Sequence, residues 1–315
     1  MKACFYNQFG PPSVLQIGEI DPPKIADDEY LIAVRYAGVN PVDYKIRHGY
    51  FQGALPQQFP IVSGWDFAGV VAECGKKCKK FKVGDEVFGD LRPDTIQWGT
   101  YAEFCPAKEK ALALKPKQIS FAQAAGLCIP SLTAWQALFD TAKLSGKETI
   151  FITGGSGGVG SMAIQFAKMK GAKVITSART VNHSYVKSLG ADLAIDYTKE
   201  NPVKKILSLF PNGIDLVFDL VGGTTLQQSA LLVKKRGYLI SIVDPQVAKM
   251  ASKDLHAAFV FCEGRGGQLE TIADLVVKGA VHPPEILELE LKDAVKAHEM
   301  IEEGHTRGKI VLRVS

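Results

Sequence analysis

The segment from Ile152 to Gly160 reads Ile-Thr-Gly-Gly-Ser-Gly-Gly-Val-Gly, and its spacing suggests a specific chemistry. Gly155, Gly157 and Gly160 stand in G-x-G-x-x-G spacing between an apolar, strand-like run and apolar residues at helical spacing. Glycine lets backbone N–H groups in a tight turn approach a pyrophosphate, and a helix beginning beyond Gly158 adds unpaired N–H groups and the positive end of its dipole. The pattern predicts a dinucleotide-binding loop. The alternative is a purely structural glycine turn.

The next strand-like run ends in Thr176-Ser-Ala-Arg179, where an enzyme that uses NAD would carry an acidic side chain for the ribose 2′-hydroxyl. No carboxylate is present among these four residues. Hydroxyl groups and a guanidinium, here from Ser177 and Arg179, suit a 2′-phosphate through charge-assisted hydrogen bonds. The sequence therefore favours NADPH, and the alternative is a surface arginine without a ligand.

A second feature is the stretch Pro60-Ile-Val-Ser-Gly-Trp-Asp-Phe-Ala-Gly69, in which a strand runs into a Trp-Asp pair. A catalytic zinc needs three Cys, His or carboxylate ligands and an open position. The six histidines form no H-x-x-x-H motif and none pairs with a cysteine at ligand spacing, while Cys74 and Cys78 are an isolated close pair. We therefore expect no metal site.

The segment Val39-Asn-Pro-Val-Asp-Tyr-Lys-Ile-Arg47 holds further polar groups that could do chemistry. Asn40 is a neutral donor and acceptor that could position a cofactor or substrate, or it could cap the backbone in a turn. Asp43 and Arg47 are spaced i, i+4 on a predicted helix, and we expect them to form an ion pair.

The elements that must position these residues change in type along the chain. Up to about residue 120, short β-branched runs alternate with Gly- and Pro-rich turns, which is typical of an all-β barrel or sandwich. From about residue 145, six strand-like runs alternate with helical ones, which predicts a doubly wound parallel sheet. The final segment, Gly308-Lys-Ile-Val-Leu-Arg-Val314, again has β character. We therefore expect an α/β protein whose first domain comprises residues 1–122 and 282–315 and whose second comprises 123–281.

Composition narrows the range of partners. The 315 residues are 46% hydrophobic and 22% charged, with a net charge of +4 that is scattered along the chain. We expect no nucleic-acid partner, because such proteins concentrate basic residues on one face. No apolar run approaches the length of a membrane span. Six dispersed cysteines and the lack of a secretory leader predict reduced thiols and a cytoplasmic location.

Several motifs, in their order along the chain, resemble the zinc-free quinone oxidoreductase group of the medium-chain dehydrogenase/reductases. They include Ala-Gly-Val-Asn-Pro-Val-Asp-Tyr-Lys (37–45), Gly-Trp-Asp-Phe-Ala-Gly (64–69), the glycine loop and Gly-Lys-Ile-Val-Leu (308–312). Within the group, the chain looks closest to alkenal/enone oxidoreductases. Where zinc-dependent members carry a ligand cysteine, a ligand histidine and an acidic neighbour, this chain has Asn40, Trp65 and Asp66.

The resemblance implies a GroES-like β-barrel catalytic domain, a Rossmann NADPH-binding domain and a homodimer joined through the edge strand near Ala257. It implies hydride transfer from NADPH to a quinone or to the C=C bond of an α,β-unsaturated carbonyl. Lys45, where many members carry a tyrosine, would donate to the cofactor ribose or to the substrate carbonyl; Lys309 is given no role. The alternatives are a non-catalytic NADPH-binding module and a zinc alcohol dehydrogenase. The positions implied to bind the cofactor are Thr133, Gly155, Gly157, Gly158, Val159, Gly160, Ser177, Arg179, Tyr197, Val221, Gly222 and Val243.

Overall fold

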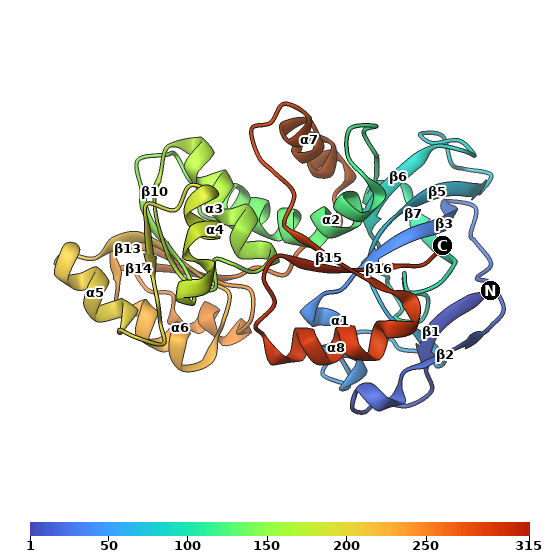
Figure 1. Ribbon diagram of the computed structural model, residues 1–315, viewed down its shortest axis with the longest axis horizontal. Coiled ribbons are helices and arrows are strands. Elements are labelled where there is room, and N and C mark those ends of the chain that lie inside the picture. Colours follow the sequence, from blue (N-terminus) through green and yellow to red (C-terminus); the bar gives the residue numbers. More distant parts are fainter. The chain divides into compact units, whose positions relative to one another are not determined.

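The computed structural model describes residues 1–315, which fall into two compact units (Figure 1). The first unit comprises Met1–Ile129, Glu263–Gly279 and Pro283–Ser315, and the second comprises Pro130–Cys262 and Ala280–His282. The division falls within helix α2 (Phe121–Trp135). Both chain termini therefore lie in the first unit.

The first unit is built from two sheets. Strands β1 (Lys2–Tyr6), β2 (Gln16–Glu19) and β4 (Ile61–Val62) form a three-stranded sheet in the order β2-β1-β4. The larger sheet has the order β15-β16-β3-β5-β6-β8, with β7 paired to β3. Its end strands β15 and β8 do not pair with each other, so strand pairing does not close it into a barrel. Its strands are β3 (Glu29–Gly38), β5 (Asp66–Cys74), β6 (Glu86–Asp90), β7 (Phe104–Lys108), β8 (Leu112–Leu114), β15 (Ile286–Glu290) and β16 (Lys309–Arg313).

Alternation of side chains along β3 produces the core of this unit. Tyr30, Ile32 and Val34 point to one face and pack with Phe67 and Val71 of β5, because residues two apart in a strand share a face. The helices of this unit are α1 (Pro41–Arg47), α7 (Gly266–Val277) and α8 (Ala294–Glu303), with 3-10 turns η1 (Pro12–Val14), η2 (Glu109–Ala111) and η6 (Leu291–Asp293). Helix α7 packs against β8 and η2, although we expected this segment in the nucleotide-binding half.

The second unit contains one six-stranded parallel sheet in the order β11-β10-β9-β12-β13-β14. This is the doubly wound order of a Rossmann fold, which confirms the predicted parallel sheet. Helix α3 packs against β9 and β10, and α4 against β11. The elements are β9 (Thr149–Ile152), α3 (Gly158–Lys170), β10 (Lys173–Ser177), α4 (His183–Ser188), β11 (Leu193–Ile195), α5 (Pro202–Leu209), β12 (Ile214–Asp219), α6 (Gly223–Ala230), β13 (Val233–Ser241) and β14 (Leu255–Phe259), with short helical turns η3 (Gln136–Thr141), η4 (Thr180–Asn182) and η5 (Pro245–Met250).

The helical spacing of apolar residues continues past the end of α6. Leu226, Ala230 and Val233 are spaced as on one face of a helix, but α6 ends at Ala230 and Val233 already begins β13. Val233 pairs with Ile214 of β12, and Leu232 is fully buried. Strand pairing and burial therefore override the local helical pattern at this point.

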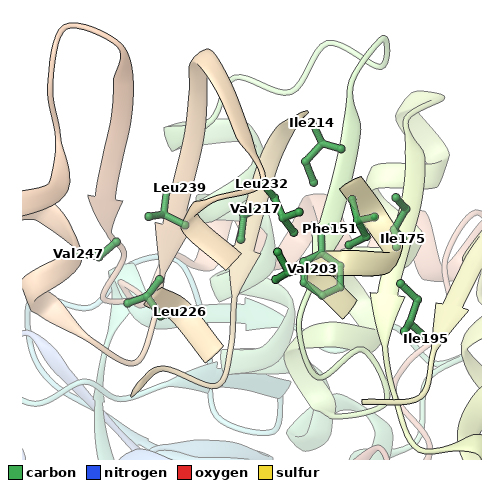
Figure 2. Close-up of a cluster of buried hydrophobic side chains, with 11 residues drawn as sticks. Phe151, Ile175, Ile195, Val203, Ile214, Val217, Leu226, Leu232, Leu239 and Val247 are labelled. Carbon is green, nitrogen blue, oxygen red and sulfur yellow. The ribbon is translucent and has the colours of Figure 1, made fainter. Parts of the chain in front are cut away.

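Figure 2 shows the core on one face of this sheet. Phe151, Ile175, Val217 and Leu239 come from four neighbouring strands. Val203 of α5 and Leu226 of α6 pack against them, and all six side chains are buried. This packing fixes the strands whose carboxyl ends carry the candidate site.

Across the whole chain, no helix combines the length and the apolar character needed to cross a membrane.

Candidate functional site

The glycine loop connects β9 to α3 and is tied to the end of the neighbouring strand β10. Gly154 N–H donates to the Ser177 hydroxyl oxygen at 3.1 Å, and Gly155 N–H donates to the Ser177 carbonyl at 3.0 Å. Gly157 is the residue before helix α3, and no side chain caps this helix end. The first N–H groups of the helix therefore lack intrahelical acceptors and suit an anionic group.

The glycines of this loop serve different purposes. A Cβ on Gly155 would lie 2.0 Å from the Thr176 hydroxyl oxygen, and one on Gly160 would lie 2.4 Å from the Gly154 carbonyl oxygen. The fold itself therefore requires glycine at both positions. A Cβ on Gly157 would meet only the Gly154 carbonyl oxygen at 3.6 Å, an ordinary contact, and its φ of −79° suits any residue. At Gly157 the protein leaves room that a Cβ would fill, which is the geometry needed for close approach of a phosphate.

The loops after β10 and β11 carry the residues expected near the adenosine end of the cofactor. Arg179 is exposed and immediately precedes η4, and Tyr197 is 46% exposed. Asp196 joins the two loops by accepting the Thr180 N–H at 2.7 Å and the Thr198 N–H at 2.9 Å. Hydrogen bonds from the Thr180 and Thr198 hydroxyls hold the pKa of the Asp196 carboxyl below its usual range. The second unit thus brings Ser177, Arg179 and Tyr197 to the same edge of its sheet as the glycine loop, because parallel strands end together there.

Asp219, which sequence reasoning missed, holds the remaining loops at this edge. It ends β12, is fully buried, and accepts the Gly222 N–H at 3.1 Å and the Ser241 hydroxyl at 2.8 Å. Ser241 in turn accepts the Val243 N–H at 3.2 Å. The loops carrying Val221, Gly222 and Val243 are therefore fixed by one carboxylate. An acidic residue at the end of an otherwise apolar strand was the available signal.

Thr133, the remaining predicted cofactor contact, lies in α2 and is only 4% exposed.

In the first unit, Lys45 lies on α1 and is partly buried, and its ammonium makes no hydrogen bond or ion pair. Burial lowers the pKa of this ammonium from its ordinary value. A partly desolvated cation without a partner is costly unless a ligand supplies the missing negative charge or hydrogen-bond acceptor. The position therefore suits a donor to an oxygen of a bound molecule.

Asn40 lies in a buried network instead of presenting a free amide. It is 2% exposed and directly precedes α1. Its Nδ2 donates to Asp66 Oδ2 at 2.8 Å, and its Oδ1 accepts a hydrogen bond from Lys309 Nζ. Lys309 Nζ also lies 3.2 Å from Asp66 Oδ2. Both ends of the amide are thus occupied by protein groups. Lys309, for which we predicted no role, is a central member of the network.

The predicted ion pair between Asp43 and Arg47 is wrong. Asp43 instead accepts the Asn40 N–H at 2.8 Å and the Tyr101 hydroxyl at 3.0 Å, so its carboxylate caps the start of α1. Burial raises the pKa of Asp43 to about 7. Arg47 is fully buried and pairs with Glu302 of α8.

Arg47 also contacts two histidines. Its Nη1 lies 3.1 Å from His298 Nδ1, and its Nη2 lies 3.0 Å from His48 Nε2. Burial and the nearby Arg47 guanidinium lower the pKa of His298 to about 3, so this imidazole is neutral. The cluster anchors the end of α1 to α8.

The residues present do not fit a zinc ion. Nowhere in the chain do three His, Cys, Asp or Glu side chains come together in a group that would hold a metal. Asn40 and Asp66 are joined to each other and to the ammonium of Lys309, and Trp65, which directly precedes Asp66, is not a metal-binding residue type. A metal cation would have to displace a buried ammonium from its carboxylate, so the donor set opposes it.

Two segments of the chain match known protein families. Residues 26–117 match the family model described as an alcohol dehydrogenase GroES-like domain, and residues 189–312 match one described as a zinc-binding dehydrogenase. The first match agrees with the expected GroES-like domain. The description of the second names zinc, for which the donor set above is unsuited.

Three similar proteins extend the match, two of them over 99–100% of this chain. A 2-methylene-furan-3-one reductase of Solanum lycopersicum is 36% identical over 99% of this chain and 79% of its own length. A chloroplastic NADPH-dependent alkenal/one oxidoreductase of Arabidopsis thaliana is 42% identical over 77% of this chain and 62% of its own length. The solved structure of a quinone oxidoreductase from Coxiella burnetii superimposes with a TM-score of 0.90 at 36% identity, covering 100% of this chain and 99% of that one.

Proposed function

Because the chain belongs to the medium-chain dehydrogenase/reductase superfamily, among its quinone and alkenal/enone oxidoreductases, we propose that it is an NADPH-dependent oxidoreductase. Its acceptors would be quinones or the C=C bond of α,β-unsaturated carbonyls. The observation that carries the proposal is the loop at Gly157, which leaves room for a phosphate at the open N-terminus of α3. The alcohol dehydrogenase alternative needs a zinc donor set that this chain does not offer.

We propose residues 123–281 as the NADPH-binding domain, apart from helix α7, which packs against β8 and η2 of the first unit. Gly155 and Gly160 shape the turn, while Gly157, Gly158 and Val159 present backbone N–H groups to the pyrophosphate. Ser177 positions the loop, and Arg179 and Tyr197 contact the adenosine 2′-phosphate, for which a guanidinium gives charge-assisted hydrogen bonds. Residues proposed to line the rest of the cofactor are Thr133, Val221, Gly222 and Val243.

We propose residues 1–122 and 282–315 as the catalytic domain. When bound, NADPH supplies the hydride to the acceptor. Lys45 would then donate a hydrogen bond to the acceptor's carbonyl oxygen, where negative charge develops as the hydride arrives. Partial burial of the ammonium strengthens this interaction, because a lower local dielectric weakens screening. For an enone, the resulting enolate takes its proton from solvent or a relayed donor. Asn40, whose amide is occupied, would act by positioning α1.

Two finer proposals concern assembly and location. Strand β14 is the end strand of the six-stranded sheet, with an unpaired edge that we propose pairs with its twin in a homodimer. Size-exclusion chromatography with light scattering tests this. All six cysteines are free thiols, which supports the proposed cytoplasmic location. Imaging of the tagged chain tests that.

The experiment is NADPH oxidation by the purified protein with a quinone panel and a panel of 2-alkenals and enones, with NADH for comparison. We expect turnover with NADPH that exceeds turnover with NADH. Lys45→Met should reduce enone turnover, while Lys24→Met, at an exposed lysine of the same unit, should leave it unchanged. Tight NADPH binding without turnover on either panel would reject the enzyme proposal in favour of a binding module.

A further inference from the structure

Lys309 occupies a position unusual for a lysine. It is the first residue of β16 and is 4% exposed, although lysine is almost never fully buried unless it is paired. Its ammonium meets Asn40 Oδ1 and, at 3.2 Å, Asp66 Oδ2. The backbone N–H of Lys309 donates to the Glu285 carbonyl at 2.8 Å, which fixes the start of the strand.

The ammonium closes a triangle that joins several segments of the first unit. Asn40 directly precedes α1, Asp66 begins β5, and these two side chains also hydrogen-bond to each other. The second oxygen of Asp66 accepts the Ile129 N–H at 3.0 Å, which adds α2 to the assembly. One cation therefore holds together the ends of elements that are far apart in sequence.

The local charges make this cation necessary. Asp90 lies opposite Asp66 in the pairing of β5 with β6, and both carboxyls are buried. Burial and the proximity of Asp66 raise the pKa of Asp90 well above its usual range. Burial also raises the pKa of Asp66, and the charge of the Lys309 ammonium is the strongest of the interactions that oppose this rise. Without the ammonium, Asp66 would be a buried carboxylate with no ion-pair partner.

The helix that Lys309 anchors is short and carries Lys45. Helix α1 has seven residues, and a helix of this length has little stability of its own and takes its orientation from its anchors. Its anchors are Asn40 at the start, Asp43 with Tyr101 in the first turn, and Arg47 with Glu302 at the end. Of these side chains, only Asn40 is in direct contact with Lys309.

We infer that Lys309 is a positioning residue: its buried ammonium fixes Asn40 and the start of α1, and so sets the placement of Lys45. The inference rests on the proposed function for the role of Lys45, but the anchoring itself does not. A small displacement of a group that contacts the reacting molecule lowers the rate of the chemical step more than it weakens cofactor binding.

The test compares Lys309→Met and Lys309→Arg with Lys115→Met. Lys115 is a matched control, because it is also a buried lysine of the first unit, is paired with Glu86 and donates to the Ile119 carbonyl. The measurements are kcat and KM for an enone, the Kd for NADPH by fluorescence, and amide hydrogen exchange across α1. Lys309→Met should lower kcat by about 10- to 100-fold with NADPH affinity retained. It should also speed exchange in α1, and Lys309→Arg should recover part of both losses.

Unchanged kcat and unchanged exchange in a folded Lys309→Met protein would overturn the inference, as would an equal loss of kcat in Lys115→Met. Should Lys309→Met fail to fold, the double variant Asp66→Asn, Lys309→Met removes both charges and is measured in the same way. If Lys45→Met retains full enone turnover, the proposed function of Lys45 fails, whereas exchange in α1 still decides whether Lys309 anchors the helix.

Discussion

Gly157→Ala should weaken NADPH binding while leaving the fold nearly as stable as before. In the protein alone, the added Cβ would meet only the Gly154 carbonyl oxygen at 3.6 Å, and the backbone at this residue is in an ordinary extended conformation. Stability should therefore fall by no more than about 1 kcal/mol, the cost of replacing glycine by alanine before a helix. With a pyrophosphate over the helix end, the same methyl group would be overpacked. Overpacking costs about 1–3 kcal/mol, which corresponds to about a 5- to 150-fold rise in the Kd for NADPH.

The assay is NADPH titration by intrinsic fluorescence, paired with urea unfolding of the same preparations. Gly160→Ala is the contrasting variant, since its Cβ would lie 2.4 Å from the Gly154 carbonyl oxygen. We expect that variant to lose stability, whereas Gly157→Ala loses affinity. Wild-type NADPH affinity in a folded Gly157→Ala protein would refute the placement of the pyrophosphate.

Three further predictions follow from individual residues. Arg179→Ala should raise the Kd for NADPH by about 10- to 150-fold, because a hydrogen bond to a charged group contributes about 1.5–3 kcal/mol to binding. The Kd for NADH should stay unchanged. Titrations with both cofactors measure this, and equal losses of affinity for the two would exclude a contact between Arg179 and the 2′-phosphate. Burial raises the pKa of Asp43 from 3.8 to about 7, so between these pH values the folded state holds a proton that the unfolded state has lost, and the free energy of unfolding falls as pH rises. Asp43→Asn should reduce the slope of the unfolding free energy against pH by at most about 1.4 kcal/mol per pH unit. Urea unfolding between pH 3.8 and about 7 measures the slope, and an unaltered slope would contradict the raised pKa of Asp43. Because burial lowers the pKa of Lys45, enone turnover should decline on the alkaline side at a pH below that of an ordinary lysine, and this decline should vanish in Lys45→Met; a pH profile of kcat measures both effects.

The sequence predicts features that depend on local spacing. The glycine loop is one of them, because strand, turn and helix lie within a single continuous segment. Lys309 could not be found in this way, since its partners Asn40 and Asp66 lie 269 and 243 residues away. The same reason explains the wrong ion pair on α1. Spacing suggested Asp43 and Arg47, but Asp43 caps the helix and Arg47 pairs with Glu302, which is 255 residues away.

The boundary between the two units also depends on contacts between residues far apart in sequence. The sequence indicates an alternation of strands and helices beyond residue 145, but such an alternation cannot tell which sheet a helix such as α7 packs on. Contact of α7 with β8 depends on where Leu112 and Gly266 meet in space: a Cβ on Gly266 would lie 2.0 Å from the Leu112 carbonyl oxygen. This close approach is a property of the folded chain that the residue types alone do not reveal.

Isotope tracing tests hydride transfer to a C=C bond most directly. The purified protein would be given NADPH deuterated at the transferable position of the nicotinamide, with an enone as acceptor, and the product examined by NMR and mass spectrometry. We expect a saturated carbonyl with deuterium on its β-carbon, and slower formation of that product by Lys45→Met. An allylic alcohol with deuterium on the carbonyl carbon, or a saturated product without deuterium, would rule out hydride transfer from NADPH to the C=C bond.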